Sequence, residues 1–303
     1  MSIVAVLAAL ALLQDPAQAA PGAPAADQDR PAVELEDVIV EQRRLEDLTR
    51  TFVDEVGAPA SRRGLARWRS RVCVGVAGIR QDIAQHLVDH VSRVAMEFDV
   101  TPGDPGCRPN VLVIFSQQAA ALSNALVESR PRAFHLGVGG LDRGNVALRA
   151  FRESERPVRW WHVSMPTNAF TGGPGIRLPG EPPPYVVGEG FVNKGRWVRD
   201  DLNKVIIIVD GDRVDGIGLP QLADYISMVA LAQVDPDGDT SGFSSILNLF
   251  DAPDASSGLT GWDTAYLDAL YSGPSERISD GDQRWQLLRN LRLANAADDD
   301  TGG

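Results

Sequence analysis

Apolar residues in the first part of the chain form short continuous runs that alternate with longer periodic segments. Residues 71–76 are predicted to form a strand, and the run 111–115 has the unbroken apolar character of a strand that is covered on both faces. The segments 81–98 and 119–128 repeat apolar residues every three or four positions, which predicts amphipathic helices. Strand, helix, strand, helix in this order is typical of the α/β and α+β classes.

The second part of the chain adds two strands and a strongly apolar helix. Residues 158–163 and 205–209 have strand-like composition, and residues 219–234 are predicted to form the most buried helix. We therefore predict one α/β (α+β) domain over residues 46–273. Its mixed sheet is expected to contain strands near residues 72, 111, 160 and 205 and to be covered by helices.

The two ends of the chain differ in composition from this domain. Residues 1–19 contain an apolar run followed by Ala17-Gln18-Ala19, the pattern of a secretory signal peptide, although no Lys or Arg precedes the run. Residues 20–45 are expected to form a disordered linker, and residues 274–303 a polar tail. The apolar run is short for a bilayer span. We therefore expect a periplasmic or secreted protein with no integral membrane segment after signal cleavage.

The charge balance narrows the classes of partner. The formal net charge is −12 and the isoelectric point is about 4.8. Nucleic acids and anionic membranes are bound by clustered Lys and Arg, which displace counterions. We therefore expect no nucleic-acid partner.

The chain has two cysteines, Cys73 in the first predicted strand and Cys107 just before the second. Parallel neighbouring strands would bring them together. A disulfide closing a loop of about thirty residues would stabilise the fold by about 3 kcal/mol in the chain-entropy model. Such a bond also agrees with export to an oxidising compartment. Two unpaired thiols, one of them buried, are the alternative, and the disulfide is favoured.

His86, Asp89 and His90 are the candidate metal ligands. Histidines four residues apart lie on one helix face, a spacing that lets both rings reach one metal ion. A third ligand is needed, and surface histidines exposed to solvent are the commoner use of such a pair. There is no Gly-x-Ser-x-Gly sequence for a serine nucleophile.

Two short acidic segments raise the possibility of a calcium site. They are residues 210–215, after the Ile-rich strand, and Asp235-Pro236-Asp237-Gly238-Asp239. Neither has the terminal Glu of an EF-hand loop, so solvated turns are the alternative to a specific ion site.

Residues 166–190 are rich in Pro and Gly and form a long predicted loop. Loops of this length are either functional or disordered. A binding pocket under this loop, lined by Trp160 and Trp161, would suit sugar or peptide stacking, and packing of both rings in the core is the favoured alternative.

From Leu222 onward the chain resembles the metzincin zinc proteases. That family has a helix with H-E-x-x-H-x-x-G-x-x-H, then a Ser-Ile-Met turn, then a Leu-Thr-x-x-Asp helix. Here the helix around 223–234 is followed by Ser245-Ile246-Leu247 and by Leu259-Thr260-Gly261-Trp262-Asp263. An ordinary helix start with Thr260 as its N-cap also explains the last motif.

The resemblance implies a zincin-like second half in which the zinc-binding residues have been replaced. On its register Asp224, Met228 and Val234 stand at the three histidine positions, and Tyr225 stands at the position of the general base. Catalytic zinc needs three protein ligands with N, O or S donors, which this set does not supply. The resemblance therefore implies a non-catalytic protein without a cofactor.

The chain as a whole resembles an uncharacterised family of secreted bacterial proteins. The segments that carry this likeness are 71–75, 107–111, 157–163 and 199–205. It implies an exported protein and no particular activity.

Together these observations favour an exported, non-catalytic, zincin-like scaffold that binds a protein or a cell-envelope polymer. The alternative is a metal-dependent hydrolase with an unorthodox site around His86, Asp89 and His90. The sequence favours the non-enzymatic function over the hydrolase.

Overall fold

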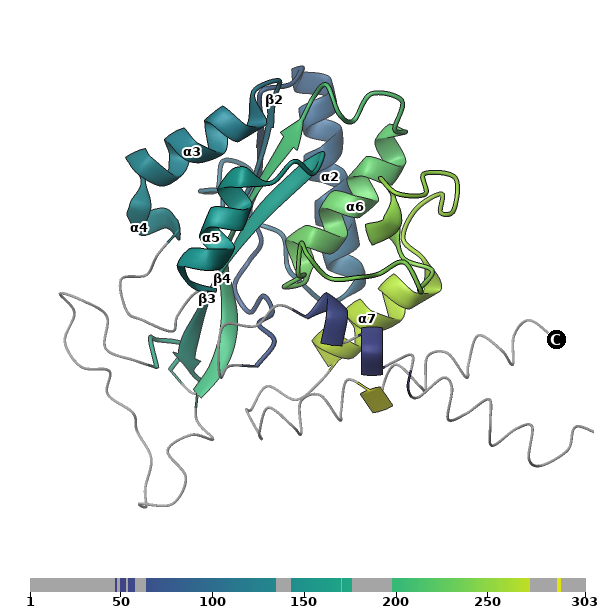
Figure 1. Cartoon of the computed structure of the whole chain (residues 1–303). Helices are drawn as coiled ribbons and strands as arrows, with labels where there is room; N and C mark the ends of the chain where they lie inside the picture. The colour runs from purple at the N-terminus through teal and green to yellow at the C-terminus, as the bar shows by residue number, and fades with distance from the viewer. Residues whose placement is uncertain are drawn as a thin grey trace, which may run out of the picture. The chain divides into compact units, whose positions relative to one another are not determined.

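Four strands form a mixed sheet in the order β1-β2-β4-β3 (Figure 1). The strands are β1 (Val74–Ala77), β2 (Val111–Ser116), β3 (Val158–Asn168) and β4 (Val198–Asp210). β1, β2 and β4 run parallel, and β3 pairs antiparallel with β4 at one edge. The mixed sheet with helices over it confirms the predicted α+β class.

This computed structural model describes residues 47, 50–52, 54–57, 64–134, 143–169, 171–175, 198–272 and 288–289. All of them belong to one compact unit, residues 42–303. The predicted signal peptide 1–19 and linker 20–45 lie outside the described residues, and so does the predicted tail 274–303 apart from residues 288–289.

β3 and β4 are longer than the sequence pattern predicted. The apolar runs 158–163 and 205–209 mark only the first half of β3 and the last part of β4, which pair with each other and are buried on both faces. A shift in register between Val163 and Ser164 separates this part from a more polar extension, where β3 pairs with residues 198–202. The extension was missed because its pairing does not depend on an apolar run.

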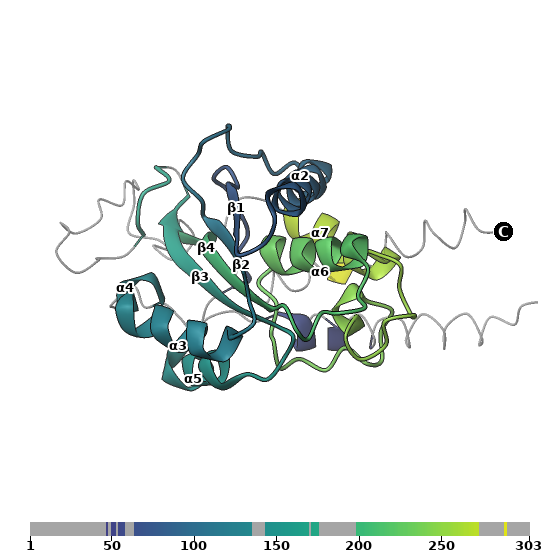
Figure 2. The same cartoon turned by 90° about the horizontal axis from the view of Figure 1, so that it is seen from above.

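Helices cover both faces of the sheet (Figure 2). On one side lie α2 (Gln81–Glu97), α6 (Leu219–Leu231) and α7 (Gly261–Ser272). On the other lie α3 (Ala119–Ser129), α4 (Pro131–Phe134) and α5 (Gly144–Glu153). A larger apolar core forms under the first group and a smaller one under the second.

α6 is deeply buried, as predicted, and nine of its side chains are buried. It begins after Gly218, with Pro220 in its first turn, where a missing N–H breaks no helical hydrogen bond. It ends at Leu231 instead of the predicted 234, because Ala232 has an extended backbone with ψ of 146°. The chain then continues into a loop at the end of the sheet.

The disulfide between Cys73 and Cys107 is present, with a Cα–Cα distance of 6.1 Å. Its cysteines precede β1 and β2, which are parallel neighbours. Gly103 lies against this bond, since a Cβ there would be 2.6 Å from Sγ of Cys107. A side chain at position 103 would therefore disturb the disulfide.

Within the part of the chain that the structure describes, no helix combines the length and the apolarity needed to span a bilayer.

Candidate functional site

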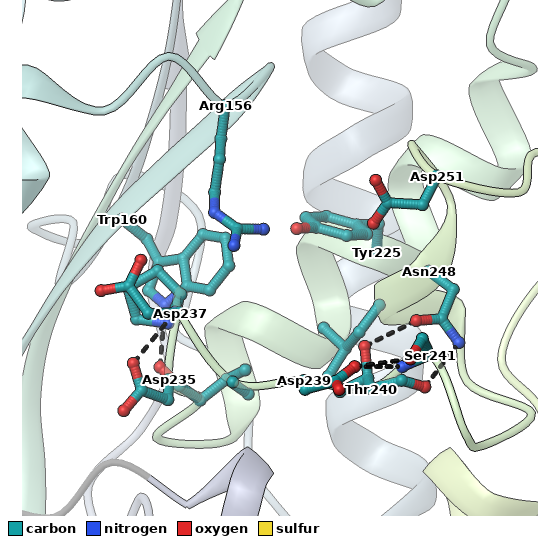
Figure 3. A pocket seen from close by; sticks show the side chains of 14 residues that line it. Arg156, Trp160, Tyr225, Asp235, Asp237, Asp239, Thr240, Ser241, Asn248 and Asp251 are labelled. Atoms are coloured by element: carbon teal, nitrogen blue, oxygen red, sulfur yellow. Dashed lines mark hydrogen bonds between the residues drawn. The ribbon is translucent and has the colours of Figure 1, made fainter.

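A cavity of about 270 Å³ opens between β3, α6 and the segment 234–251 (Figure 3). Its wall on the β3 side contains Trp160, and its wall on the α6 side contains Tyr225. Side chains from the connecting loops complete it, with carboxylate, amide and hydroxyl groups around the opening. The cavity therefore combines two aromatic side chains with many polar groups.

Tyr225 is the most deeply placed polar group of this cavity. Its side chain is 3% exposed and its ring packs edge-on against Trp160 and Phe250. Burial raises the pKa of the Tyr225 phenol well above its usual value, so the hydroxyl stays protonated. Its hydroxyl has no hydrogen-bond partner among the described residues, and Figure 3 shows it directed toward the guanidinium group of Arg156.

Trp160 is held in place by the end of α6 and the loop after it. The indole Nε1 donates a hydrogen bond to the carbonyl oxygen of Val234 at 2.9 Å. Its ring centroid lies 6.1 Å from that of Tyr225. Because its N–H is already used, Trp160 offers a ligand mainly apolar ring surface.

The loop 235–241 is fixed against the N-terminal helical segment. The backbone N–H of Asp235 donates to the carbonyl of Val56 at 2.8 Å. Gly238 lies so close to Glu55 that a Cβ would sit 2.1 Å from its carbonyl oxygen. Only glycine fits there, so the loop and the cavity wall that it forms are tightly constrained.

Two aspartates of this loop are occupied by local partners. The Asp235 carboxylate accepts hydrogen bonds from Nη2 of Arg143 at 2.7 Å and from the N–H of Asp237 at 3.0 Å. Asp239 accepts from both the N–H and the hydroxyl of Ser241, and these bonds lower the pKa of its carboxyl. The carboxylates of Asp235 and Asp239 therefore stabilise the loop.

Asn248 closes the opposite side of the same loop. Its Nδ2 donates to the carbonyl oxygens of Thr240 and Phe243, and its Oδ1 accepts from the Thr240 hydroxyl at 2.6 Å. Asn248 belongs to the short 3-10 turn η2 (Ile246–Asn248). The turn therefore fixes the position of the cavity rim.

Three charged side chains around the cavity have no partner among the described residues. They are the guanidinium group of Arg156 and the carboxylates of Asp237 and Asp251. All three also border an adjoining, more open hollow that includes Arg213. These groups are free to bind hydroxyl, amide or charged groups of a ligand.

The structure gives the three predicted metal ligands different partners, although the rings of His86 and His90 are neighbours with centroids 6.1 Å apart. Asp89 accepts a hydrogen bond from Gln85, and His86 is exposed. His90 instead lies against α6, with Nε2 2.5 Å from Oδ1 of Asp224. Within the described ranges, no group of three or more His, Cys, Asp or Glu side chains is placed to hold a metal ion.

The four positions that the metzincin resemblance assigned to the zinc centre have three different surroundings. Tyr225 and Val234 line the cavity. Asp224 faces His90 of α2, and Met228 is fully buried in the core. The structure therefore does not bring the three assigned ligand positions together on one point.

Trp160 and Trp161 pack into the core, which was the favoured interpretation. As neighbours in β3 they belong to the two different apolar cores, one on each face of the sheet. The Nε1 of Trp161 donates to the carbonyl of Phe134. They therefore cannot line one pocket together, and most of the loop 166–190 lies outside the described residues.

The sequence did not identify the cavity residues Arg156 and Asp251. They come from different connections, before β3 and after η2, and nothing in their local spacing indicates that they meet. The acidic segment 235–239, a calcium candidate by its sequence, lies at the cavity.

These features define an α+β protein with a small, polar cavity at one end of its sheet. No family model, curated protein or solved structure matches the chain.

Proposed function

We propose that this is an exported, non-catalytic protein with a zincin-like second half, and that it binds its partner through the cavity around Tyr225. The partner would be a protein or a cell-envelope polymer. The observation that carries this proposal is the composition of the cavity. Tyr225, Val234 and Leu247 stand at three positions of the metzincin motifs, and they border a hollow rich in hydrogen-bonding groups.

The chemistry of the cavity favours binding over catalysis. A general base must take up a proton, whereas burial keeps the Tyr225 phenol protonated at neutral pH. The free side chains Arg156, Asp237 and Asp251 are arranged around the opening, where they contact whatever enters. Such groups fix the orientation of a ligand without reacting with it.

The zincin-like part of the proposal draws support from the order and contacts of the motifs. Buried helix, Ser-Ile turn and Leu-Thr-x-x-Asp helix follow one another as the resemblance expects. The turn and the last helix are joined directly, since Asp263 accepts hydrogen bonds from the Ser245 hydroxyl and from the N–H of Ile246. This contact links the two motifs in space as well as in sequence.

Export is supported by the Cys73–Cys107 disulfide, because such bonds persist in oxidising compartments. The signal-peptide pattern of residues 1–19 points in the same direction. A periplasmic or secreted location is therefore part of the proposal.

The test is cosedimentation of the purified protein with insoluble cell-wall polymer, together with crosslinking to envelope proteins. Asp251→Arg reverses the charge at the cavity opening without removing a side-chain hydrogen bond, so it should abolish binding. Asp254→Arg changes an exposed aspartate of the same loop that does not line the cavity, and it should bind normally. Equal binding by both variants would overturn the assignment of this site.

A further inference from the structure

Tyr225 is the feature of the cavity that indicates a ligand. Its side chain is 3% exposed, yet its hydroxyl has no hydrogen-bond partner among the described residues and faces the hollow (Figure 3). A hydroxyl that opens into a cavity can both donate and accept a hydrogen bond. It is therefore available to a molecule that enters the hollow.

The free charges around Tyr225 restrict the chemistry of such a molecule. Arg156 offers only donors, whereas Asp237 and Asp251 offer only acceptors. An anion would meet the carboxylates of Asp237, Asp239 and Asp251, none of which is paired with a cation among the described residues. A cation would meet the unpaired guanidinium group of Arg156. Uncharged hydroxyl groups both donate and accept, so they satisfy all of these groups without bringing a further charge into the cavity.

The dimensions and walls of the cavity restrict the size of this molecule. A volume of about 270 Å³ is close to the lower end of the range of about 300–1,000 Å³ for small-molecule pockets, which suits one ring with its substituents. Trp160 and Tyr225, whose rings pack against each other, contribute the aromatic part of the wall. A ring with C–H groups on its faces and hydroxyls at its edge matches this arrangement.

We propose that the cavity binds a single uncharged saccharide residue, with a ring hydroxyl hydrogen-bonded to Tyr225 and others to Arg156 and Asp251. The inference rests on the proposed function, whose partner it narrows to an envelope polysaccharide. The saccharide residue would be the part of that polymer that enters the cavity.

The first experiment compares rings that differ in charge. Glucose, galactose, mannose and N-acetylglucosamine are titrated calorimetrically into the full-length mature protein, beside glucosamine and glucuronate as cationic and anionic counterparts. At least one neutral sugar should bind, and the charged counterparts should bind at least severalfold more weakly. Binding by none of the neutral sugars, or tighter binding of a charged one, would overturn the proposal.

A pair of variants locates the binding. Tyr225→Phe removes only the unpartnered hydroxyl and should weaken sugar binding about tenfold, the equivalent of about 1.4 kcal/mol. Tyr266→Phe removes the hydroxyl of another fully buried tyrosine that does not line the cavity, and it should leave the affinity unchanged. Equal affinities for Tyr225→Phe and wild type would contradict the assigned contact.

The two proposals fail in different ways. In one outcome, Asp251→Arg loses binding of the polymer or protein, but the wild type binds no sugar. The cavity would then remain the binding site, and the saccharide proposal would be rejected. Sugar binding that survives Asp251→Arg and Tyr225→Phe would place the sugar elsewhere and reject the inference. Binding of a partner that ignores Asp251→Arg would reject the proposed function itself.

Discussion

The carboxylate of Asp263 accepts a hydrogen bond from the hydroxyl of Ser245 at 2.6 Å, and both residues are buried. The same carboxylate accepts from the N–H groups of Ile246 and Thr260. In return, Thr260 accepts a hydrogen bond from the N–H of Asp263, which forms a capping box at the start of α7. Asp263 therefore joins the start of α7 to the turn that holds the cavity rim.

Replacing Asp263 should destabilise the fold strongly. Asp263→Ala leaves the buried N–H of Ile246, the partly buried N–H of Thr260 and the Ser245 hydroxyl without their acceptor. This loss should lower the free energy of unfolding by about 2–4 kcal/mol. Urea denaturation measures this change. Asp268→Ala, at an exposed position of the same helix, is the control and should change it by less than about 0.5 kcal/mol. Similar losses in both variants would reduce Asp263 to an ordinary helix residue.

His162 should make the fold sensitive to acid. Its ring is buried in β3, with Nε2 2.8 Å from the carbonyl oxygen of Val229. Burial lowers the pKa of His162 from 6.5 to about 4, despite this hydrogen bond. The unfolded chain therefore binds a proton more readily than the folded one, and stability should fall as the pH drops from 6.5 toward 4. Above pH 6.5 the His162 ring is neutral in both the folded and the unfolded chain, so this loss of stability is absent.

The magnitude of this effect is about 3 kcal/mol between those two pH values. Denaturation curves of wild type and His162→Gln across the window measure it, because glutamine does not titrate. The difference in unfolding free energy between the two proteins should change with pH in this range and stay constant above it. A pH-independent difference would show that His162 titrates normally in the folded state.

The sequence predicted the central sheet because apolar runs mark strands that are buried on both faces. The runs around Val111 and Val205 correspond to β2 and β4, and the spacing of Leu87, Val91 and Val94 corresponds to α2. Polar strand extensions have no such mark. The extended part of β3 after Val163 was therefore missed.

The cavity was harder to predict, because its residues meet only in the folded chain. Arg156, Tyr225 and Asp251 come from three separate connections or elements, and no short motif contains them. The histidine pair at 86 and 90 had the right local spacing for a metal site. Helical spacing fixes only the relative positions on one helix, and it could not show that His90 faces Asp224 of α6.

Replacing Tyr266 with phenylalanine should stabilise the protein. Its ring is fully buried beside Phe52, and its hydroxyl has no hydrogen-bond partner among the described residues. Tyr266→Phe removes this buried polar group while keeping the ring, so the free energy of unfolding should rise by about 1 kcal/mol. Thermal or urea denaturation tests this. A loss of stability would show that the hydroxyl has a partner, such as a bound water molecule.

His86 and His90 should differ sharply when each is replaced by alanine. The side chains of His90 and Asp224 are 12% and 18% exposed and join α2 to α6, whereas His86 is exposed to solvent. His90→Ala leaves the largely buried Asp224 carboxylate without this partner and should cost about 1–2 kcal/mol of unfolding free energy. His86→Ala should stay within about 0.5 kcal/mol of wild type.

If the two histidines shared a metal ion, both would be needed for metal binding and for the stability that the ion supplies. Equal destabilisation, together with loss of stoichiometric metal measured by elemental mass spectrometry, would therefore favour the hydrolase alternative with His86, Asp89 and His90 as ligands.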